Sequence, residues 1–409
     1  MKNSKLLVVA DDLTGANDTG VMFAEAGFTT ILETNTISLE KIDISRGDIF
    51  SVSTDSRAIG EQAEQKTYQV ISQGINKKIN QLYLKIDSTM RGSVHFQIKG
   101  ALKAWRTLYP NAKAIICSAY PTMGRTIENG HLYVNNIPVN ETPSGKDAIC
   151  PVRSSYLLDL LPEAMHLPCS TVAELISQIN STNSEQIIID AKTEYDLSVI
   201  ANVINQLGNH IIPVGSAGLA DHLIRKHQKQ VITKDTNLGR TLILVTSIHE
   251  TSQNQVDQYI STVGAKSIVF NPSPSQLINY ELSNEALILQ FKALIHSSTE
   301  NVIIRANPSQ IINNSFGNIP EIAKKIAEYL AELGICALNH EKFDSLILFG
   351  GDGAAMLLNK MNISEMNIQY AIVPGVPLCI INNDQYNGLK VITKSGGFGD
   401  KNLLNDIFS

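Results

Sequence analysis

Short apolar runs rich in valine and isoleucine recur along the chain and alternate with longer amphipathic stretches. These runs are KLLVVA (5–10), DIFSVST (48–54), QLYLKI (81–86), AKAIICSA (112–119), EQIIIDA (185–191) and HIIPVGS (210–216). The stretch SVHFQIKGALKAWRTL lies between two runs and places Val94, Ile98, Leu102 and Leu108 near one face of a predicted helix. Strands that alternate with helices predict an α/β fold with a mainly parallel sheet. In such sheets, ligands bind at the loops beyond the carboxyl ends of the strands.

The alternation is interrupted once, by the polar and aperiodic stretch KHQKQVITKDTNLGR. It then restarts with TLILVTS (241–247), NVIIRA (301–306) and SLILFGGDG (345–353), and ends in glycine-rich extended segments. We therefore predict two domains, residues 1–228 and 241–409, joined by a linker at 229–240. Each domain should contain a mainly parallel sheet flanked by helices.

Composition excludes several classes of function. The chain has 409 residues, 43% of them hydrophobic and 18% charged, which is typical of a globular protein with a large core. A net charge of −6 argues against a general nucleic-acid or anionic-membrane binder, although a local basic site for a small anion is compatible with it. The N-terminus lacks a signal-peptide pattern, and no apolar stretch reaches membrane-spanning length. Five scattered cysteines without a CxxC pair indicate reduced thiols, so we expect a soluble cytoplasmic protein.

The first predicted loop, VVADDLTGANDTG (8–20), is unusually acidic. Asp11 and Asp12 directly follow the first predicted strand, and Asp18 lies six residues further on. One interpretation is a helix N-terminus, where Asp, Thr and Asn are favoured caps. A cap needs a single side chain, however, and carboxylates at this position can accept hydrogen bonds from a polyhydroxylated ligand or take a proton from a hydroxyl. We expect Thr14 or Asn17 to cap the helix while Asp12 contacts the ligand.

Two further predicted strand ends carry acids, hydroxyls and an arginine. The first is STDSR, with Arg57, and the second is KIDSTMRG. The residues of interest in the second are Lys85, Asp87, Ser88, Thr89 and Arg91. The simplest alternative to a ligand site is that these side chains are ordinary solvated surface residues. An arginine guanidinium, however, can bind a carboxylate bidentately. Together these residues predict a site for a small ligand that is both a carboxylate and a polyol.

A later segment, SAYPTMGRTIENGHLYVN, adds two candidates, Arg125 and His131. For His131 we favour a structural hydrogen bond over a role in the site.

The predicted second domain contains three loops suited to phosphate. Gly350, Gly351 and Gly353 lie between a strand and a helix, where backbone N–H groups can face an anion. The tail TKSGGFGD contributes Gly396 and Gly397, and TSIHETSQNQ is a third loop, rich in hydroxyls. The chain has neither a GxxxxGK[ST] nor a GxGxxG pattern, which excludes a P-loop and disfavours a dinucleotide enzyme. It also lacks GxSxG, HExxH and a clustered His/Cys set, so hydrolase and zinc-enzyme functions are disfavoured.

These motifs resemble those of the four-carbon acid sugar kinases. The matching segments, in order, are ADDLTGANDTG, KIDSTMRG, GRTIENGHLYVNNIP, PVRSS, VPGVPL and KSGGFGD. The resemblance implies an N-terminal substrate domain, a C-terminal nucleotide domain and an active site in the cleft between them. It implies ATP-dependent phosphorylation of the terminal hydroxyl of a four-carbon sugar acid, with Mg²⁺ offsetting the charge of the transferred group.

The resemblance also implies roles for individual residues. Substrate contacts are expected from Asp11, Asp12, Arg57, Lys85, Asp87, Ser88, Thr89 and Arg91, with Asp12 as the catalytic group that orients the attacking hydroxyl. Nucleotide contacts are expected from Ser247, Gly350, Gly351, Asp352, Gly353, Gly375, Gly396 and Gly397. Two positions depart from the family pattern. Thr246 stands where the family usually has glycine, and Gly353 stands where it usually has threonine.

Several alternatives remain open from the sequence. The ANDTG variant of the first loop resembles the D-threonate and D-erythronate kinases more than the 3-oxo-tetronate kinases, and it does not distinguish the first two. We expect D-threonate as the substrate, with D-erythronate and 3-oxo-tetronate as alternatives. A different class of function is a non-enzymatic sugar-acid sensor, against which the three phosphate-type loops argue. The expected partners are the sugar acid and ATP, without nucleic acid or membrane. A homodimer is compatible with the sequence, and no metal ligands are assigned.

Overall fold

The computed structural model describes residues 5–34, 42–147, 149–224, 237–247, 249–263, 267–278, 284–307, 319–373 and 375–409. The chain divides into two compact units, Met1–Gln230 and Val231–Ser409. The predicted linker at 229–240 falls mostly on residues 225–236, which lie outside the described residues. Both units are α/β with mainly parallel sheets, which confirms the predicted fold class.

The sheet of the first unit has the strand order β2-β3-β1-β4-β11-β5-β10-β9, and every pair is parallel. Its strands are β1 (Leu6–Ala10), β2 (Thr30–Glu33), β3 (Ile49–Ser53), β4 (Gln81–Lys85), β5 (Lys113–Cys117), β9 (Ala164–Leu167), β10 (Gln186–Ile189) and β11 (Ile211–Gly215). A separate antiparallel sheet contains β6 (Arg125–Glu128), β7 (His131–Val134) and β8 (Ile137–Pro138). Most residues of the parallel strands are buried, as expected for a sheet covered on both faces.

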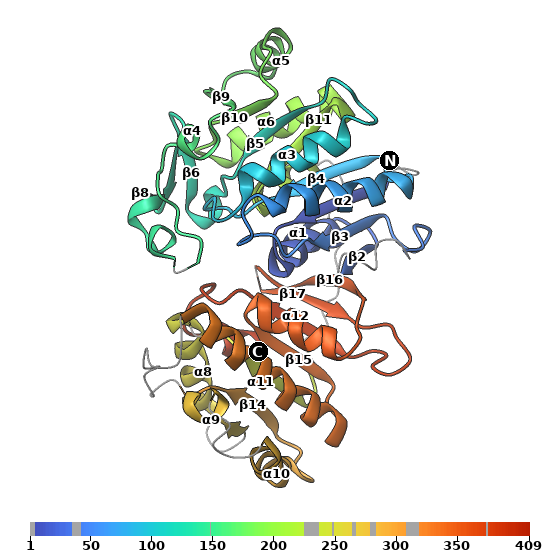
Figure 1. Ribbon diagram of the computed structural model, residues 1–409, viewed down its shortest axis with the longest axis vertical. Helices are drawn as coiled ribbons and strands as arrows, with labels where there is room; N and C mark the ends of the chain where they lie inside the picture. The colour runs from blue at the N-terminus through green and yellow to red at the C-terminus, as the bar shows by residue number, and fades with distance from the viewer. Residues whose placement is uncertain are drawn as a thin grey trace. The chain divides into compact units, whose positions relative to one another are not determined.

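The helices of the first unit are α1 (Leu13–Glu25), α2 (Gln62–Asn76), α3 (Val94–Trp105), α4 (Leu157–Leu160), α5 (Val172–Ser181), α6 (Glu194–Leu207) and α7 (Ala217–Ile224). The short α4 contacts β9, and the other helices form two groups. In one group α2 packs on α3, and in the other α1, α7, α6 and α5 pack in series (Figure 1). The core includes Phe50, Tyr83 and Trp105. Leu108 was expected on the buried face of α3 but is 44% exposed, because the helix ends at Trp105.

The sheet of the second unit has the order β13-β14-β12-β15-β18-β17-β16. Its strands are β12 (Thr241–Val245), β13 (Ser267–Phe270), β14 (Asn301–Arg305), β15 (Ser345–Phe349), β16 (Glu365–Val373), β17 (Val376–Ile380) and β18 (Lys390–Lys394). The last pairings, β16 with β17 and β17 with β18, are antiparallel, in agreement with the extended tail expected from the sequence.

Helices of the second unit also form two groups. They are α8 (Glu250–Val263), α9 (Pro274–Ile278), α10 (Asn284–Ile295), α11 (Ile319–His340), α12 (Gly351–Lys360) and α13 (Leu403–Ile407). Helix α11 packs against α9, α10 and α12, whereas α8 packs against α13 (Figure 1). Across the part of the chain that the structure describes, no helix is long and apolar enough to cross a membrane.

Candidate functional site

Three of the predicted loops leave the same edge of the first sheet. Strand β1 lies between β3 and β4, and Ala10 pairs in register with Ser53 on one side and Lys85 on the other. All three strands are parallel, so their carboxyl ends lie next to one another. The acidic first loop, STDSR and KIDSTMRG are therefore brought together, although some 80 residues of sequence separate the first from the last.

Arg57 is the centre of this cluster. Its Nε donates to Asp11 Oδ2 at 2.5 Å, its Nη1 lies 2.9 Å from Asp12 Oδ2, and its Nη2 lies 3.8 Å from Asp87 Oδ1. Burial opposes the charge on Arg57, but the three carboxylates outweigh it and hold the pKa of the guanidinium well above its ordinary value. The arginine thus organises the acids of two different loops.

Asp87 is held by a second arginine in its own loop. Arg91 donates to it bidentately, from Nη2 to Oδ1 at 2.9 Å and from Nε to Oδ2 at 3.1 Å, and Thr89 donates from both its hydroxyl and its amide. Burial by itself would raise the pKa of Asp87, but Arg91 and Arg57 together hold it well below the ordinary value. Arg91 also lies 3.3 Å from Asp147 Oδ2, so its fork is fully engaged.

Asp12 caps helix α1, which corrects the expectation that Thr14 or Asn17 would do so. Asp12 Oδ1 accepts the amide of Gly15 at 2.7 Å, and Thr14 and Asn17 lie inside the helix. The same side chain therefore uses one oxygen for the cap and the other for Arg57. A Cβ at position 15 would lie only 2.7 Å from Asp12 Oδ1, which explains the glycine there.

Asp11 is buried, and its second oxygen has no partner in the described chain. Arg57 engages Oδ2, while Oδ1 accepts no hydrogen bond. Burial, with a contribution from the neighbouring Asp12, raises the pKa of Asp11 against the attraction of Arg57. A buried carboxylate oxygen of this kind requires a donor, and a ligand hydroxyl would supply one.

Two further cations near the cluster, Lys85 and Arg125, differ in their hydrogen bonds. Lys85 is buried beneath the first turn of α1, and its Nζ donates to the carbonyl of Ile86 at 3.0 Å. Arg125, at the start of β6, donates to the carbonyl of Met123, while its Nε is buried without a partner in the described chain. Neither side chain forms an ion pair with a described residue. Burial lowers the pKa of Arg125, and Asp87 and Arg91 both act on it electrostatically.

The other predicted residues of this unit have simpler positions. Ser88 is half-buried in the loop after β4. Asp18 lies inside α1, and burial raises its pKa. His131 is hydrogen-bonded to Ser155 Oγ at 3.1 Å and packs on the ring of Tyr156, which agrees with the structural role expected for it.

The three glycine and hydroxyl loops of the second unit also share one edge. Strand β15 lies between β12 and β18, with Phe349 in register with Val245 and with Lys394. The amides of Thr246 and Ser247 donate to the carbonyl of Phe349. Gly350 has φ 101° and precedes α12 without a side-chain cap, so the first amides of that helix are available to a ligand. Gly351 and Asp352 form this first turn, and the side chain of Asp352 lies outside the described part.

Gly396 and Gly397 approach the first of these loops closely. A Cβ at position 396 would lie 2.5 Å from Ser247 Oγ, and one at position 397 would lie 3.2 Å from His249 Nε2. Gly375, in the β16–β17 turn, instead packs on the ring of Phe398, at 2.4 Å from an added Cβ. The β16–β17 turn therefore packs against the 395–400 turn through Phe398.

Two polar residues at this edge were not identified from the sequence. His249 follows β12, and its Nδ1 accepts the amide of Thr251, which leaves Nε2 as the donor near Gly397. Arg305 ends β14 beside β12, pairs with Asp257 at 2.7 Å and has a buried Nε without a partner in the described chain. The strand-end position of Arg305 was the signal that could have indicated it.

Thr246 and Gly353, the two departures from the family pattern, touch each other. A Cβ at position 353 would lie 2.0 Å from Thr246 Oγ1 and 2.4 Å from Thr246 Cβ. Thr246 Oγ1 meanwhile donates to the carbonyl of Phe349 at 2.8 Å. One small space between the two loops therefore holds a single side chain, which here belongs to position 246.

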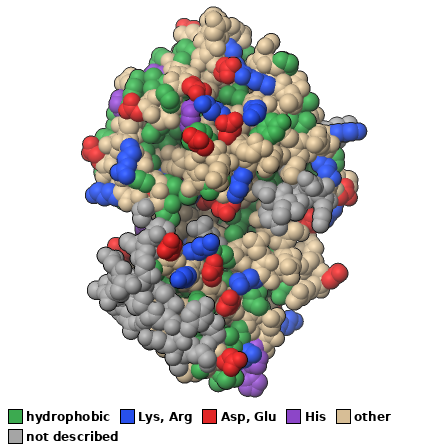
Figure 2. Space-filling model, in the orientation of Figure 1, with side chains coloured by type: hydrophobic (Ala, Val, Ile, Leu, Met, Phe, Trp, Pro, Cys, Tyr) green, Lys and Arg blue, Asp and Glu red, His purple; other side chains and the backbone are tan. Residues whose placement is uncertain are grey.

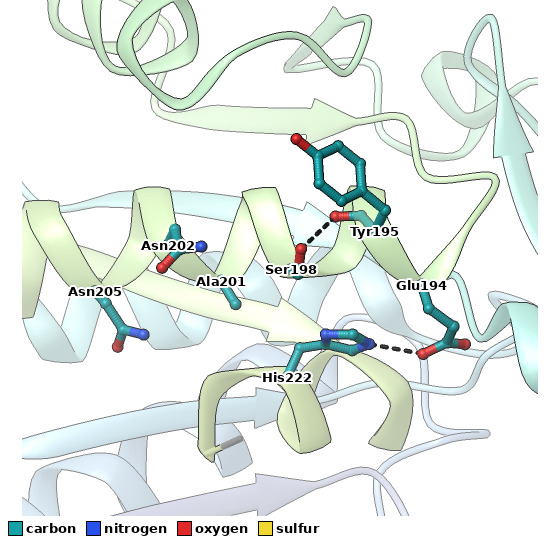
Figure 3. A pocket seen from close by; sticks show the side chains of 7 residues that line it. All are labelled: Glu194, Tyr195, Ser198, Ala201, Asn202, Asn205 and His222. Atoms are coloured by element: carbon teal, nitrogen blue, oxygen red, sulfur yellow. Dashed lines mark hydrogen bonds and ion pairs between the residues drawn. The ribbon is translucent and has the colours of Figure 1, made fainter. Parts of the chain in front are cut away.

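A separate hollow of about 320 Å³ lies between α6 and α7. It is lined by Glu194, Tyr195, Ser198, Asn202, Asn205 and His222 (Figure 3). His222 Nε2 and Glu194 Oε2 are 2.7 Å apart and hydrogen-bonded, while His222 Nδ1 is buried without a partner in the described chain. None of the residues predicted for the site lines it.

Among the described residues, one further cluster of charged groups could hold a ligand. On the face seen in Figure 2, the acidic and basic side chains of the coloured residues are interspersed. His296, His340 and Glu341 have ligand atoms within 4.8 Å of one another and could hold a metal ion. The Glu341 oxygens, however, already accept from Ser297 N and Arg240 Nη1, and both histidines are exposed.

Two family profiles match almost the whole chain. The profile described as "Sugar-binding N-terminal domain" matches residues 6–223, and the one described as "Nucleotide-binding C-terminal domain" matches residues 242–404. The chain is 30% identical to a D-threonate kinase of Bordetella bronchiseptica, over 97% of this chain and 95% of that protein. It is 28% identical to a D-threonate kinase of Salmonella typhimurium, over 98% and 97%. A D-erythronate kinase of Heliobacterium modesticaldum is 25% identical, over 97% and 94%.

Solved structures extend the same similarity to the fold. A Bordetella bronchiseptica protein, described as a domain-swapped dimer with bound citrate, is 30% identical with a TM-score of 0.51, over 98% of this chain and 97% of that one. A Salmonella typhimurium protein has a TM-score of 0.81 at 22% identity, over 98% of each chain, and supports the fold alone.

The contact between Thr246 and Gly353 predicts a non-additive pair of substitutions. Gly353→Thr alone should destabilise the second unit by about 1–3 kcal/mol, because its Cβ would overlap Thr246. The double variant Thr246→Gly/Gly353→Thr should regain most of that loss, since the side chain is then supplied from the other loop. Calorimetric unfolding of the single and double variants measures this coupling, with Thr246→Gly alone as the control. Strictly additive effects would contradict the shared space.

Proposed function

We propose that this chain, which belongs to the four-carbon acid sugar kinase family, transfers the γ-phosphoryl group of ATP to the terminal 4-hydroxyl of D-threonate. The coarser statement, that it is a phosphotransferase acting on an alcohol group, follows from its kinase relatives. That evidence also removes the alternative of a non-enzymatic sensor. The observation that carries the substrate proposal is the cluster of Asp11, Asp12 and Asp87 around Arg57.

The acids of the cluster suit the hydroxyls of the sugar acid. Asp11 Oδ1 is buried and lacks a donor, and Asp12 and Asp87 lie on the same guanidinium. A polyol presents several O–H donors at short spacing, so it can satisfy such a group of acceptors at once. A substrate without a hydroxyl at this place would leave Asp11 Oδ1 unpaired, which costs binding free energy.

The substrate carboxylate needs a cation that the protein does not already use. The sequence suggested Arg57, Lys85 and Arg91 for this task, but the forks of Arg57 and Arg91 face protein carboxylates. We assign the carboxylate to Arg125, whose Nε has no partner in the described chain and which interacts electrostatically with Asp87 and Arg91. Arg57 and Arg91 would then position the acids.

Asp12 is our proposed catalytic residue. Its Oδ1 is fixed by the cap to Gly15 and its Oδ2 by Arg57, so the carboxylate is rigid before any ligand binds. A rigid acceptor can orient the attacking hydroxyl and take its proton as transfer proceeds. Because the transition state of phosphoryl transfer is loose, orientation should contribute more than proton abstraction.

The second unit is the proposed site for ATP. The amides of the first turn of α12, the hydroxyl of Ser247 and the turn at Gly396 and Gly397 offer donors to phosphate oxygens. Mg²⁺ would bind with the phosphates and offset their charge during transfer. The Ser247 hydroxyl is an oxygen donor of the kind Mg²⁺ accepts.

D-Erythronate and 3-oxo-tetronate remain the alternative substrates. D-Threonate and D-erythronate differ at one stereocentre, so an ADP-release assay of purified protein with ATP and Mg²⁺ is the direct test. The panel should contain D-threonate, D-erythronate, their L forms and 3-oxo-tetronates. We expect the highest kcat/KM with D-threonate. A higher kcat/KM with another acid would identify that acid as the substrate in place of D-threonate. No turnover with any of the acids would contradict the proposal.

We also propose a homodimer, supported by the dimeric Bordetella structure. Molar mass measured by light scattering tests it, and a monomer at assay concentration would contradict it.

Asp12→Asn tests the catalytic assignment. Asparagine keeps an oxygen that can cap α1 but removes the charge, so we expect normal folding and normal ATP binding. The kcat with D-threonate should fall about 10²- to 10⁴-fold, the usual range for loss of a general base. Steady-state kinetics and circular dichroism measure both. Unchanged turnover would remove Asp12 from the mechanism.

Arg125→Met tests the carboxylate assignment. The variant should raise KM for D-threonate about 10- to 100-fold, because a charge-assisted hydrogen bond contributes about 1.5–3 kcal/mol. KM for ATP should not change. The control is Lys192→Met. Lys192 is exposed and pairs with Glu128, which lies on β6 like Arg125, so this variant should behave like the wild type. A normal KM in Arg125→Met would contradict the assignment.

A further inference from the structure

Lys394, the last residue of β18, is completely buried yet has no carboxylate partner in the described chain. Its relative exposure is 0%. Its Nζ donates to Ser252 Oγ at 3.1 Å, to Gln255 Oε1 at 2.7 Å and to the carbonyl of Gly396 at 3.1 Å. The ammonium also lies 4.8 Å from the centre of the Phe349 ring. A buried cation compensated only by neutral groups is costly to a fold, and its presence calls for an explanation.

The three contacts of Lys394 require the charged form of the side chain. Gln255 Oε1 and the Gly396 carbonyl can only accept, and Ser252 Oγ gives its own proton to the same carbonyl at 2.6 Å. Three acceptors need three N–H donors, which an ammonium has and a neutral amine lacks. Burial opposes this charge and lowers the pKa of Lys394 to about 7.

The groups around Lys394 fix the 395–400 turn through its carbonyls. Lys394 and Ser252 hold the carbonyl of Gly396, and Gln255 Nε2 donates to the carbonyls of Phe398 and Asp400 at 2.9 and 2.7 Å. The C=O and N–H of one trans peptide point in opposite directions. The amide of Gly397 is therefore directed away from the buried cluster, and it makes no hydrogen bond with the residues that the structure describes.

Lys394 also connects this turn to the neighbouring glycine loop. Its carbonyl accepts the amide of Gly350 at 2.9 Å, directly before α12. The 395–397 turn approaches Ser247 and His249 on its other side. One residue thus fixes, by its side chain and its backbone, two of the three loops at this edge.

We propose that Lys394 is a positioning residue for ATP, holding the Gly396–Gly397 turn and the start of α12 so that their amides face the phosphates. This inference rests on the proposed function of the second unit. The lysine acts through the turn and does not touch the nucleotide. The ammonium of Lys394 is buried on the carbonyl side of the Gly396–Gly397 peptide, in a medium of low polarity. There its positive charge strengthens the attraction of the amides for an anion.

Lys394→Met is the test, with Lys390→Met as the matched control. Lys390 lies at the other end of β18 and donates from Nζ to the carbonyl of Asn237. We expect Lys394→Met to raise the calorimetric Kd for ATP–Mg²⁺ about 10- to 100-fold and KM for ATP in parallel, as for loss of a charge-assisted contact. The Kd for D-threonate should not change. Methionine removes a costly buried charge but leaves Gln255 Oε1 without its donor, so the Tm should fall by no more than about 8 °C.

Each other outcome has a definite meaning. An unchanged Kd for ATP–Mg²⁺ in the variant overturns the inference, and so does a fall in Tm with equal weakening for both ligands, which would show a merely structural role. If Lys394→Met does not fold, Ser252→Ala decides. That variant should weaken ATP binding about 2- to 10-fold, and a wild-type Kd overturns the inference. Wild-type protein that binds no ATP–Mg²⁺ contradicts the proposed function itself.

Discussion

The arrangement of the first unit depends on the contact of the Arg57 guanidinium with three carboxylates. Asp11, Asp12 and Asp87 come from two loops, and without a shared cation their charges would repel one another in a buried site. Losing one partner of a buried ion pair typically costs about 3–5 kcal/mol. The position of Arg57 is in turn fixed by Gly92 and Ser93, since a Cβ at 92 would lie 2.3 Å from the Arg57 carbonyl and both Ser93 donors bond that oxygen. The site is thus rigid before a substrate arrives, as phosphoryl transfer by positioning requires.

The second unit relies on close approach of backbone instead of charge. Its loops meet because glycine stands where any side chain would overlap a neighbour, as Gly353 does with Thr246 and Gly396 with Ser247. Amides can then face an anion without an intervening side chain. Lys394, one of the cations at this edge, is completely buried and holds the carbonyl of Gly396. The polar cluster of the first unit is therefore organised by charge, and that of the second by close backbone contacts.

Much of this could be predicted from the sequence, and the limits have physical causes. Val/Ile runs at regular intervals indicated the strands, and the strand ends indicated which polar residues cluster at one edge of the sheet, because both signals are local. The pairing of Arg57 with Asp11 depends on β1 lying beside β3, a strand order that no local pattern encodes. The cap was misassigned because Asp12 serves two partners at once. His249 acquires its place only through the approach of Gly397 from the far end of the unit.

In the proposed reaction, the acidic cluster presents the terminal hydroxyl of a sugar acid to ATP. Phosphorus NMR of the product formed from D-threonate by the wild-type protein tests this most directly. Phosphate on the terminal methylene couples to two protons, so the account predicts a phosphomonoester triplet that grows as ATP is consumed. A doublet, which reports phosphate on a secondary carbon, or inorganic phosphate alone would contradict it.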